Sequence, residues 1–293
     1  WAGVLAGFLI LSYYSVIAGW ALAYVFRAVA GTFTGATAEG IASIFGQLTG
    51  DPERLLAWHT IFMVMTMFVV ARGVSHGLEK AVRLLMPALF VLLLILVGYA
   101  WNSGGFHQGM DFLFKPDFHR LTGNGILIAM GHAFFTLSLG MGAIMVYGSY
   151  LPDRASIAKT SIAVSVMDTL VAILAGLAIF PIVFANGLEP GVGPGLIFQT
   201  LPIAFGHMDY GAFFGMLFFI LLVFAAWTSA ISLIEPVVAW MVENIRLTRL
   251  MALEHRISLG EAMLQDTIDE AKRAQIQEKL VELREEEKRL NQR

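Results

Sequence analysis

Small hydroxyl and glycine residues interrupt an apolar stretch between Gly131 and Tyr150. Thr136, Ser138 and Gly140 fall together there, in a segment that is apolar enough to enter a membrane but poor in helix-forming residues. Irregular backbone survives in lipid only when it is buried in protein or lines a polar cavity. The backbone groups freed by a broken span can hold an ion and a small zwitterion. Close packing of helices through small residues is the alternative.

Asp168 is the only ionisable residue that lies well inside an apolar span of this sequence. A charged side chain at the bilayer centre costs at least ~2.5 kcal/mol on insertion scales, so it faces a partner or a cavity. Acids at this depth are commonly functional, although a protonated acid bonded to a neighbouring helix is the structural alternative. Hard cations prefer oxygen ligands, and Asp168 and Thr136 both offer them.

A second group of oxygen atoms lies near the end of the sequence's last apolar run. Thr228 and Ser229 follow Ala225 by about one helical turn, which places two hydroxyls on one side of a helix. Thr and Ser routinely bond to carbonyls of their own helix. The group is therefore a weak indication of an ion site when it is taken alone.

The composition places these residues in a polytopic membrane protein. The chain has 293 residues, of which 57% are hydrophobic and 14% charged, and its mean hydropathy is +0.72. Soluble domains carry roughly 25% charged residues. A net charge of −3 without a long basic run argues against nucleic acid as a partner. The lack of cysteine excludes disulfides and thiolate metal sites, and no nucleophile–base pair or metal-ligand cluster indicates an enzyme.

Apolar runs predict an all-α membrane protein with about six transmembrane helices, one of them broken. The first run is long enough to cross a bilayer core of ~30 Å, and the second is rather short. The predicted spans are residues 1–26, 56–71, 81–101, 125–150, 156–184 and 210–242. We expect outer loops at 28–55, which includes a short helix over 39–48, and at 102–124. Residues 185–208 are rich in Gly and Pro and are expected to fold back over a vestibule without crossing.

The connections between the spans differ in basic residues, which predicts an orientation. One set contains seven, Arg72, Lys80, Arg83, Arg154, Lys159, Arg246 and Arg249, and the alternate set four, Arg27, Arg54, Lys115 and Arg120. The first set is therefore predicted to be cytoplasmic, with span 1–26 running outward. The chain opens on Trp1 without the features of a signal peptide, so we expect an interior segment of a longer protein.

Residues 244–293 differ from the transmembrane core, residues 1–243. They hold acidic and basic residues in balance and no apolar run able to span a bilayer. Leu280, Leu283 and Leu290 recur at helical spacing, which predicts a soluble cytoplasmic helix or a short coiled coil. A solvated charged helix is the default interpretation, and a helix partner for this tail is the alternative.

Five strings in order, within residues 1–243, resemble the third to eighth helices of the neurotransmitter:sodium symporter family. They are Leu11–Trp20 for the third helix, Gly73–Pro87 for the loop into the fifth, Phe134-Phe-Thr-Leu-Ser-Leu-Gly-Met-Gly142 with Tyr147-Gly-Ser-Tyr150 for the unwound sixth, Asp168–Pro181 for the seventh and Phe224–Pro236 for the eighth. The resemblance implies a partial inverted-repeat sodium-symporter bundle of the bacterial amino-acid transporter type. The family's first, second and ninth onward helices have no counterpart here.

The resemblance also implies one substrate site and two sodium sites. The implied substrate-binding residues are Ile10, Tyr14, Phe135, Thr136, Ser138, Met141, Ser229 and Leu233. Tyr14 would lie by the substrate carboxylate. The first sodium ion would bind Thr136, Asp168 and that carboxylate, and the second would bind the Ala225 carbonyl with the hydroxyls of Thr228 and Ser229.

The predicted function is sodium-coupled symport of a neutral, hydrophobic amino acid across the cytoplasmic membrane, within a longer parent protein. A truncated, non-transporting membrane fragment or an assembly partner is the alternative. Sodium ions are expected, and an organic cofactor is not. Chloride is not expected either, because Asp168 supplies a carboxylate and Ala172 stands where chloride-dependent animal members have Ser. His132 replaces a common Gln and is either an outer-gate hydrogen-bonder or a satisfied buried histidine.

Overall fold

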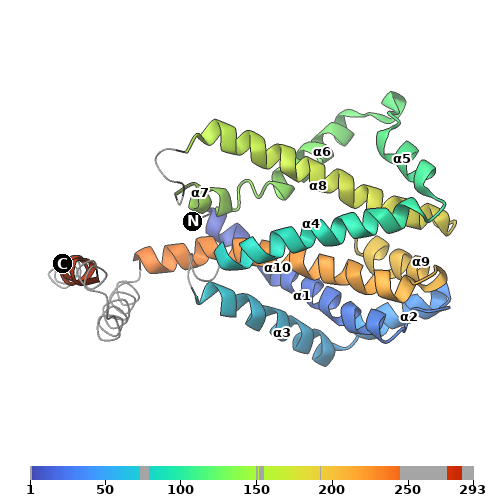
Figure 1. Cartoon of the computed structure of the whole chain (residues 1–293), viewed down its shortest axis with the longest axis horizontal. Helices are drawn as coiled ribbons and strands as arrows, with labels where there is room; N and C mark the ends of the chain where they lie inside the picture. The colour runs from blue at the N-terminus through green and yellow to red at the C-terminus, as the bar shows by residue number, and fades with distance from the viewer. Residues whose placement is uncertain are drawn as a thin grey trace. The chain divides into compact units, whose positions relative to one another are not determined.

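The computed structural model describes residues 2–72, 79–149, 151, 155–191, 193–244 and 276–285. The chain forms two compact units, Trp1–Glu235 and Pro236–Arg293. In the described part, all regular secondary structure is helical (Figure 1). The elements are α1 (Ala2–Val29), α2 (Ala38–Thr49), α3 (Pro52–Val70), α4 (Glu79–Trp101), α5 (Phe106–Phe114), η2 (Phe118–Arg120), α6 (Gly123–Thr136), α7 (Ala143–Ser149), α8 (Ile157–Ala185), η3 (Leu196–Thr200), α9 (Leu201–His207) and α10 (Gly211–Asn244).

Five helices among the described residues are long and apolar enough to cross a membrane. They contain the segments Ala2–Val29, Pro52–Val70, Lys80–Trp101, Ile157–Ala185 and Gly211–Met241. The sequence predicted about six spans, and the difference lies in the one expected to be broken. That stretch is divided into α6 and α7, neither of which has membrane length. The all-helical membrane class is confirmed, with five helices of membrane length in place of six.

Capping bonds define the starts of both helices in the first outer connection, of which the sequence Asp51-Pro52-Glu53 indicates the second. The Asp51 carboxylate accepts hydrogen bonds from the backbone N–H groups of Glu53 and Arg54, both at 3.1 Å, and Pro52 opens α3. Thr37 accepts from Gly40 N at 3.1 Å and begins α2. Each cap satisfies N–H groups that lack a partner within the first helical turn.

The second outer connection, expected to be only a loop, contains helix α5 packed on α8. A Cβ on Gly109 would lie 2.6 Å from Cγ of Pro181, so only glycine allows this approach of the two helices. α4 also lies along α8 (Figure 1). The helix was missed because its stability comes from this tertiary contact, whereas nine residues are too few to form a stable helix alone.

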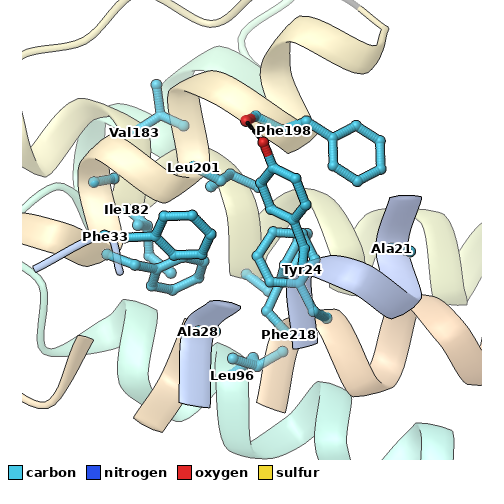
Figure 2. Packing of buried hydrophobic residues seen from close by; sticks show 14 of the residues in the cluster. Ala21, Tyr24, Ala28, Phe33, Leu96, Ile182, Val183, Phe198, Leu201 and Phe218 are labelled. Carbon is cyan, nitrogen blue, oxygen red and sulfur yellow. Dashed lines mark hydrogen bonds between the residues drawn. The ribbon is translucent and has the colours of Figure 1, made fainter. Parts of the chain in front are cut away.

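Tyr24 lies at the centre of the largest buried cluster (Figure 2). Its side chain is fully buried, and its hydroxyl donates a hydrogen bond to the Phe198 carbonyl oxygen at 3.0 Å. Its ring centroid lies 5.1 Å from those of Phe198 and Phe219 and 5.3 Å from that of Phe33. This cluster fastens the η3–α9 connection to α1. As predicted, residues 185–208 form no membrane-length helix, and η3 and α9 are both short.

In the second unit, residues 276–285 form a helix. Leu280 and Leu283 are 6% and 7% exposed and pack with Ile276 on one face. Lys279 and Glu282 form an ion pair at 2.6 Å between exposed side chains. The helical prediction holds for this segment, while Leu290 and the other predicted tail residues lie outside the described residues. The division into a core and a cytoplasmic tail, and the predicted orientation, stay predictions.

Candidate substrate and ion site

The break predicted from weak helix formers lies between Thr136, the last residue of α6, and Ala143, the first of α7. Ser138 adopts a left-handed conformation with φ of 56°, and Gly140 and Gly142 each have φ of 81°. Glycine takes such values at no steric cost, whereas a serine in this region is uncommon. The three left-handed residues turn the chain out of the helical path within six residues, 137–142.

A Schellman motif closes the end of α6. The backbone N–H of Leu139 donates to the Phe134 carbonyl oxygen at 2.9 Å, and that of Ser138 donates to the Phe135 carbonyl oxygen at 3.0 Å. This pair of bonds satisfies carbonyls that the helix end would otherwise expose. The left-handed position of the motif, usually glycine, is Ser138. The break is therefore an ordered helix end that carries a hydroxyl where most proteins have none.

Thr136 and Asp168, predicted to share a sodium ion, come together across α6 and α8. The Thr136 hydroxyl donates to Oδ2 of Asp168 at 3.1 Å, and it also lies 3.3 Å from the Ala133 carbonyl oxygen. Asp168 is half-buried and Thr136 is exposed. The contact leaves oxygen lone pairs on both side chains for a hard cation. The geometry provides two candidate ligands, and their role stays a prediction.

One apolar cluster, built by α1, α3, the break and α10, contains the predicted substrate positions Ile10, Tyr14, Met141 and Leu233. Met141 and Leu233 are 7% and 6% exposed. Ser229, another predicted substrate position, lies near Tyr14. These positions are more than 200 residues apart in the sequence, from 10 to 233, yet they converge on one side of the break.

Phe135 and Ser138 lie at the break but outside this apolar cluster. Phe135, on the last turn of α6, is 46% exposed. His132 is also exposed, and its two alternative roles stay predictions. Ala172, one turn after Asp168, is exposed as well. Residues 73–78, part of the string Gly73–Pro87, lie outside the described residues.

Two glycines that sequence reasoning missed set the distance between α1 and the break. A Cβ on Gly7 would lie 3.0 Å from the Leu233 carbonyl oxygen and 3.3 Å from the Met141 carbonyl oxygen. A Cβ on Gly3 would lie 3.0 Å from the Gly142 nitrogen. All of these neighbours are backbone atoms, which cannot move aside cheaply. Their spacing of four residues, typical of close helix packing in membranes, is a signal that could have identified them.

The predicted second sodium site lies on α10, where the Thr228 hydroxyl bonds to its own helix. It lies 3.0 Å from the Ala225 carbonyl oxygen and 3.2 Å from that of Phe224. This is the helix back-bonding that the sequence left open as an alternative. A sodium ion on the Ala225 carbonyl is compatible with it when the Thr228 proton is directed to Phe224.

A further hydroxyl pair joins α7 to α10 and was not selected from the sequence. The Tyr147 hydroxyl donates to Oγ of Ser232 at 2.7 Å, and Oγ of Ser232 donates to the Thr228 carbonyl oxygen at 3.1 Å. Tyr147 was noted only as part of a family string. Ser232 gave no signal, because one serine in an apolar helix is common and its partner lies 85 residues away.

The family assignment follows from a match over most of the chain. The model of the family described as "SNF: Sodium:neurotransmitter symporter family" matches residues 43–261. The chain belongs to the sodium:neurotransmitter symporter family. It is thus a multi-pass membrane protein of a transporter family and not an enzyme, as the sequence predicted.

Relatives in other organisms support the assignment. An uncharacterized sodium-dependent transporter of Bacillus subtilis, YhdH, is 41% identical over 239 residues, which cover 82% of this chain and 53% of the relative. An uncharacterized sodium-dependent transporter of Haemophilus influenzae is 35% identical over 251 residues, covering 84% of this chain and 55% of the relative. The chain therefore spans about half the length of these curated relatives.

A solved structure confirms the family's fold for this segment. The crystal structure of MhsT in complex with L-phenylalanine matches with a TM-score of 0.75 and 45% identity, over 83% of this chain and 56% of that chain. This chain thus shares the fold of the matching part of MhsT.

Proposed function

We propose that the protein containing this chain is a symporter that couples the entry of sodium to that of a neutral, hydrophobic amino acid across the cytoplasmic membrane. The observation that carries the proposal is the 3.1 Å contact between the Thr136 hydroxyl and the Asp168 carboxylate at the end of α6. A negative charge inside a membrane span is costly unless it is compensated, and a bound sodium ion compensates it. In this proposal α6 and α7 together form the broken span, the counterpart of the family's sixth helix.

Coupling follows from sharing the ion between protein and substrate. The carboxylate of a bound amino acid completes the oxygen shell that Thr136 and Asp168 begin, so each ligand raises the affinity for the other. Such coupling is reciprocal by thermodynamic linkage. Because Asp168 brings its own negative charge, the site does not need a chloride ion for charge balance. The predicted second sodium ion on Ala225, Thr228 and Ser229 would add a further ion to the same cycle.

The apolar cluster beside the break supports a hydrophobic substrate. Ile10, Met141 and Leu233 are apolar, and methionine can repack around side chains of different shape. Tyr14 supplies a hydroxyl for the substrate carboxylate. MhsT, at 45% identity, is described in complex with L-phenylalanine, a substrate that fits this description. The alternative, a non-transporting fragment or an assembly partner, stays open for residues 1–293 taken alone.

The test is the substitution Asp168→Asn in a full-length transporter that carries this chain. We expect the variant to need more sodium for half-maximal uptake, or to acquire a response to chloride, because the amide keeps an oxygen but loses the charge. Asp111→Asn on α5, where the residue is exposed, is the matched control and should behave as the wild type. Sodium and chloride titrations in proteoliposomes give the readout, and identical curves for Asp168→Asn and the wild type would overturn the ion assignment.

A further inference from the structure

Two hydroxyl groups make a directed hydrogen-bond chain from α7 to α10. A hydroxyl carries one proton. Ser232 donates that proton to the Thr228 carbonyl oxygen at 3.1 Å, so it can only accept from Tyr147, whose hydroxyl lies 2.7 Å away. The chain therefore runs in one direction, from Tyr147 through Ser232 to the backbone of Thr228.

The hydrogen-bond chain starts on α7, whose position is not fixed by the preceding helix, α6. α7 has seven residues and follows the break, where three left-handed residues redirect the backbone. The first residue of α7, Ala143, is buried, with 1% of its surface exposed. Tyr147 lies one turn later and is half-buried. Its bond to Ser232 ties the last turn of α7 to α10.

The hydrogen-bond chain ends on the turn of α10 that holds the proposed ligands of the second sodium ion. In a helix the Thr228 carbonyl also accepts the backbone N–H four residues on, so Ser232 places a second hydrogen bond on it. Back-bonding of this kind bends helices slightly. The Thr228 hydroxyl has two acceptors, the carbonyl oxygens of Ala225 at 3.0 Å and Phe224 at 3.2 Å. Small changes in the bend thus decide whether the Ala225 carbonyl is available to a cation.

We propose that Ser232 is a positioning residue that transmits the placement of α7, through Tyr147, to the sodium-binding turn Ala225–Ser229 of α10. The proposal rests on the proposed function. It makes the affinity for sodium depend on a contact that touches neither the ion nor the substrate. Cutting the contact at either end should therefore change sodium binding in the same direction.

Glu235 complicates the Tyr147 end of the chain and determines how the experiment is designed. It is 6% exposed, lies one turn beyond Ser232, and interacts electrostatically with Tyr147. A change at Tyr147 therefore alters both its hydrogen bond to Ser232 and its interaction with Glu235. Ser232→Ala removes only the hydroxyl and leaves the electrostatic interaction between Glu235 and Tyr147 in place.

The experiment compares Ser232→Ala, Tyr147→Phe and the double variant in a full-length transporter that carries this chain. Sodium titrations of thermal stability in detergent give the apparent sodium Kd without a transported substrate, since ligand binding raises stability. Each single variant should shift this Kd about three- to tenfold in the same direction, the range for loss of one net hydrogen bond. The double variant should shift it no further. The KM for L-phenylalanine at saturating sodium should stay unchanged.

Two matched substitutions control for the loss of a hydroxyl elsewhere in the membrane. Ser165→Ala on α8 removes a hydroxyl that bonds to its own helix at 3.0 Å, and Tyr13→Phe on α1 changes a tyrosine that is 49% exposed. Both should leave the sodium Kd as it is. Ser232→Thr keeps the hydroxyl and should retain the wild-type value, which separates the hydrogen bond from packing.

The outcomes distinguish this inference from the proposed function. If the wild type responds to sodium but the Ser232 and Tyr147 variants respond identically to it, the inference is wrong and the proposed function stands. Additive shifts in the double variant, or a Ser232→Thr variant that behaves like Ser232→Ala, would also overturn it. A wild type without any response to sodium overturns both.

Discussion

At the scale of single residues, the break depends on a serine in a conformation that favours glycine. A left-handed residue with a Cβ costs roughly 1–2 kcal/mol, and Ser138 has φ of 56°. Strain of this kind persists only when the surrounding structure imposes it, and it is concentrated at functional sites. The Ser138 hydroxyl, which is also a predicted substrate contact, is the group that glycine could not supply.

Ser138→Gly should therefore stabilise the folded protein by about 1 kcal/mol, since it relieves the left-handed strain at the end of α6. It should also weaken amino-acid binding, because the hydroxyl is lost. Thermal unfolding of a full-length transporter and its KM measure the two effects. Ser138→Ala is the control, because it loses the hydroxyl and keeps the strain. Equal unfolding temperatures for the two variants would contradict the role of strain.

The sequence predicted that a break occurs, but not which of its residues adopt the left-handed backbone conformation. Thr136, Ser138 and two glycines identified the region by their low helix propensity. Among them, Gly140 and Gly142 are the better candidates for left-handed backbone, and they do adopt it. That Ser138 joins them depends on the Schellman bonds of Phe134 and Phe135. Those bonds follow from where α6 ends, which propensity fixes only to within a few residues.

At the scale of elements, α1 packs its first two turns against the backbone of both the break and α10. The contact uses Gly3 and Gly7, beside which a Cβ would meet backbone atoms at 3.0 Å. Lipid tails are as apolar as the helices, so association in the membrane depends on packing of this kind rather than on the hydrophobic effect. The position of α1 therefore sets the width of the predicted substrate site.

Gly7→Ala should destabilise the folded protein by roughly 1–3 kcal/mol, the cost of overpacking a close contact. Its methyl group must push on the carbonyl groups of Leu233 and Met141, so KM for the substrate should rise as well. Gly98→Ala is the matched control, since nothing lies within 4 Å of a Cβ there. It should be neutral or slightly stabilising, because alanine favours helix. A Gly7→Ala variant as stable as Gly98→Ala would show that α1 is free to shift.

Elements whose signal is local were predictable, and those held by tertiary contacts were not. The cap at Asp51 is readable because the capping residue and the helix are adjacent in sequence. α5 was missed because its contact with α8 depends on Gly109 and Pro181, which are 72 residues apart. The closeness of Thr136 and Asp168 also lay beyond periodicity. It was expected only from the resemblance to a family.

At the scale of the whole molecule, the predicted substrate site brings together residues from both ends of the core. Ile10 and Tyr14 come from α1, Met141 from the break, and Leu233 from α10. None of these carries a formal charge. Burying a charged substrate group without a partner would be costly, so acidic and basic amino acids should be excluded.

Competition in a full-length transporter that carries this chain tests this specificity. Leu, Met, Phe and Trp should displace bound L-phenylalanine, because the apolar cluster beside the break accepts their side chains. Glu and Lys should not displace it, since no predicted pocket residue pairs with their charges. Alanine is the internal control. It shares the carboxylate that Tyr14 would bind but buries little apolar surface, so it should compete weakly. If Glu or Lys competes best, the pocket lies elsewhere even though the family assignment holds.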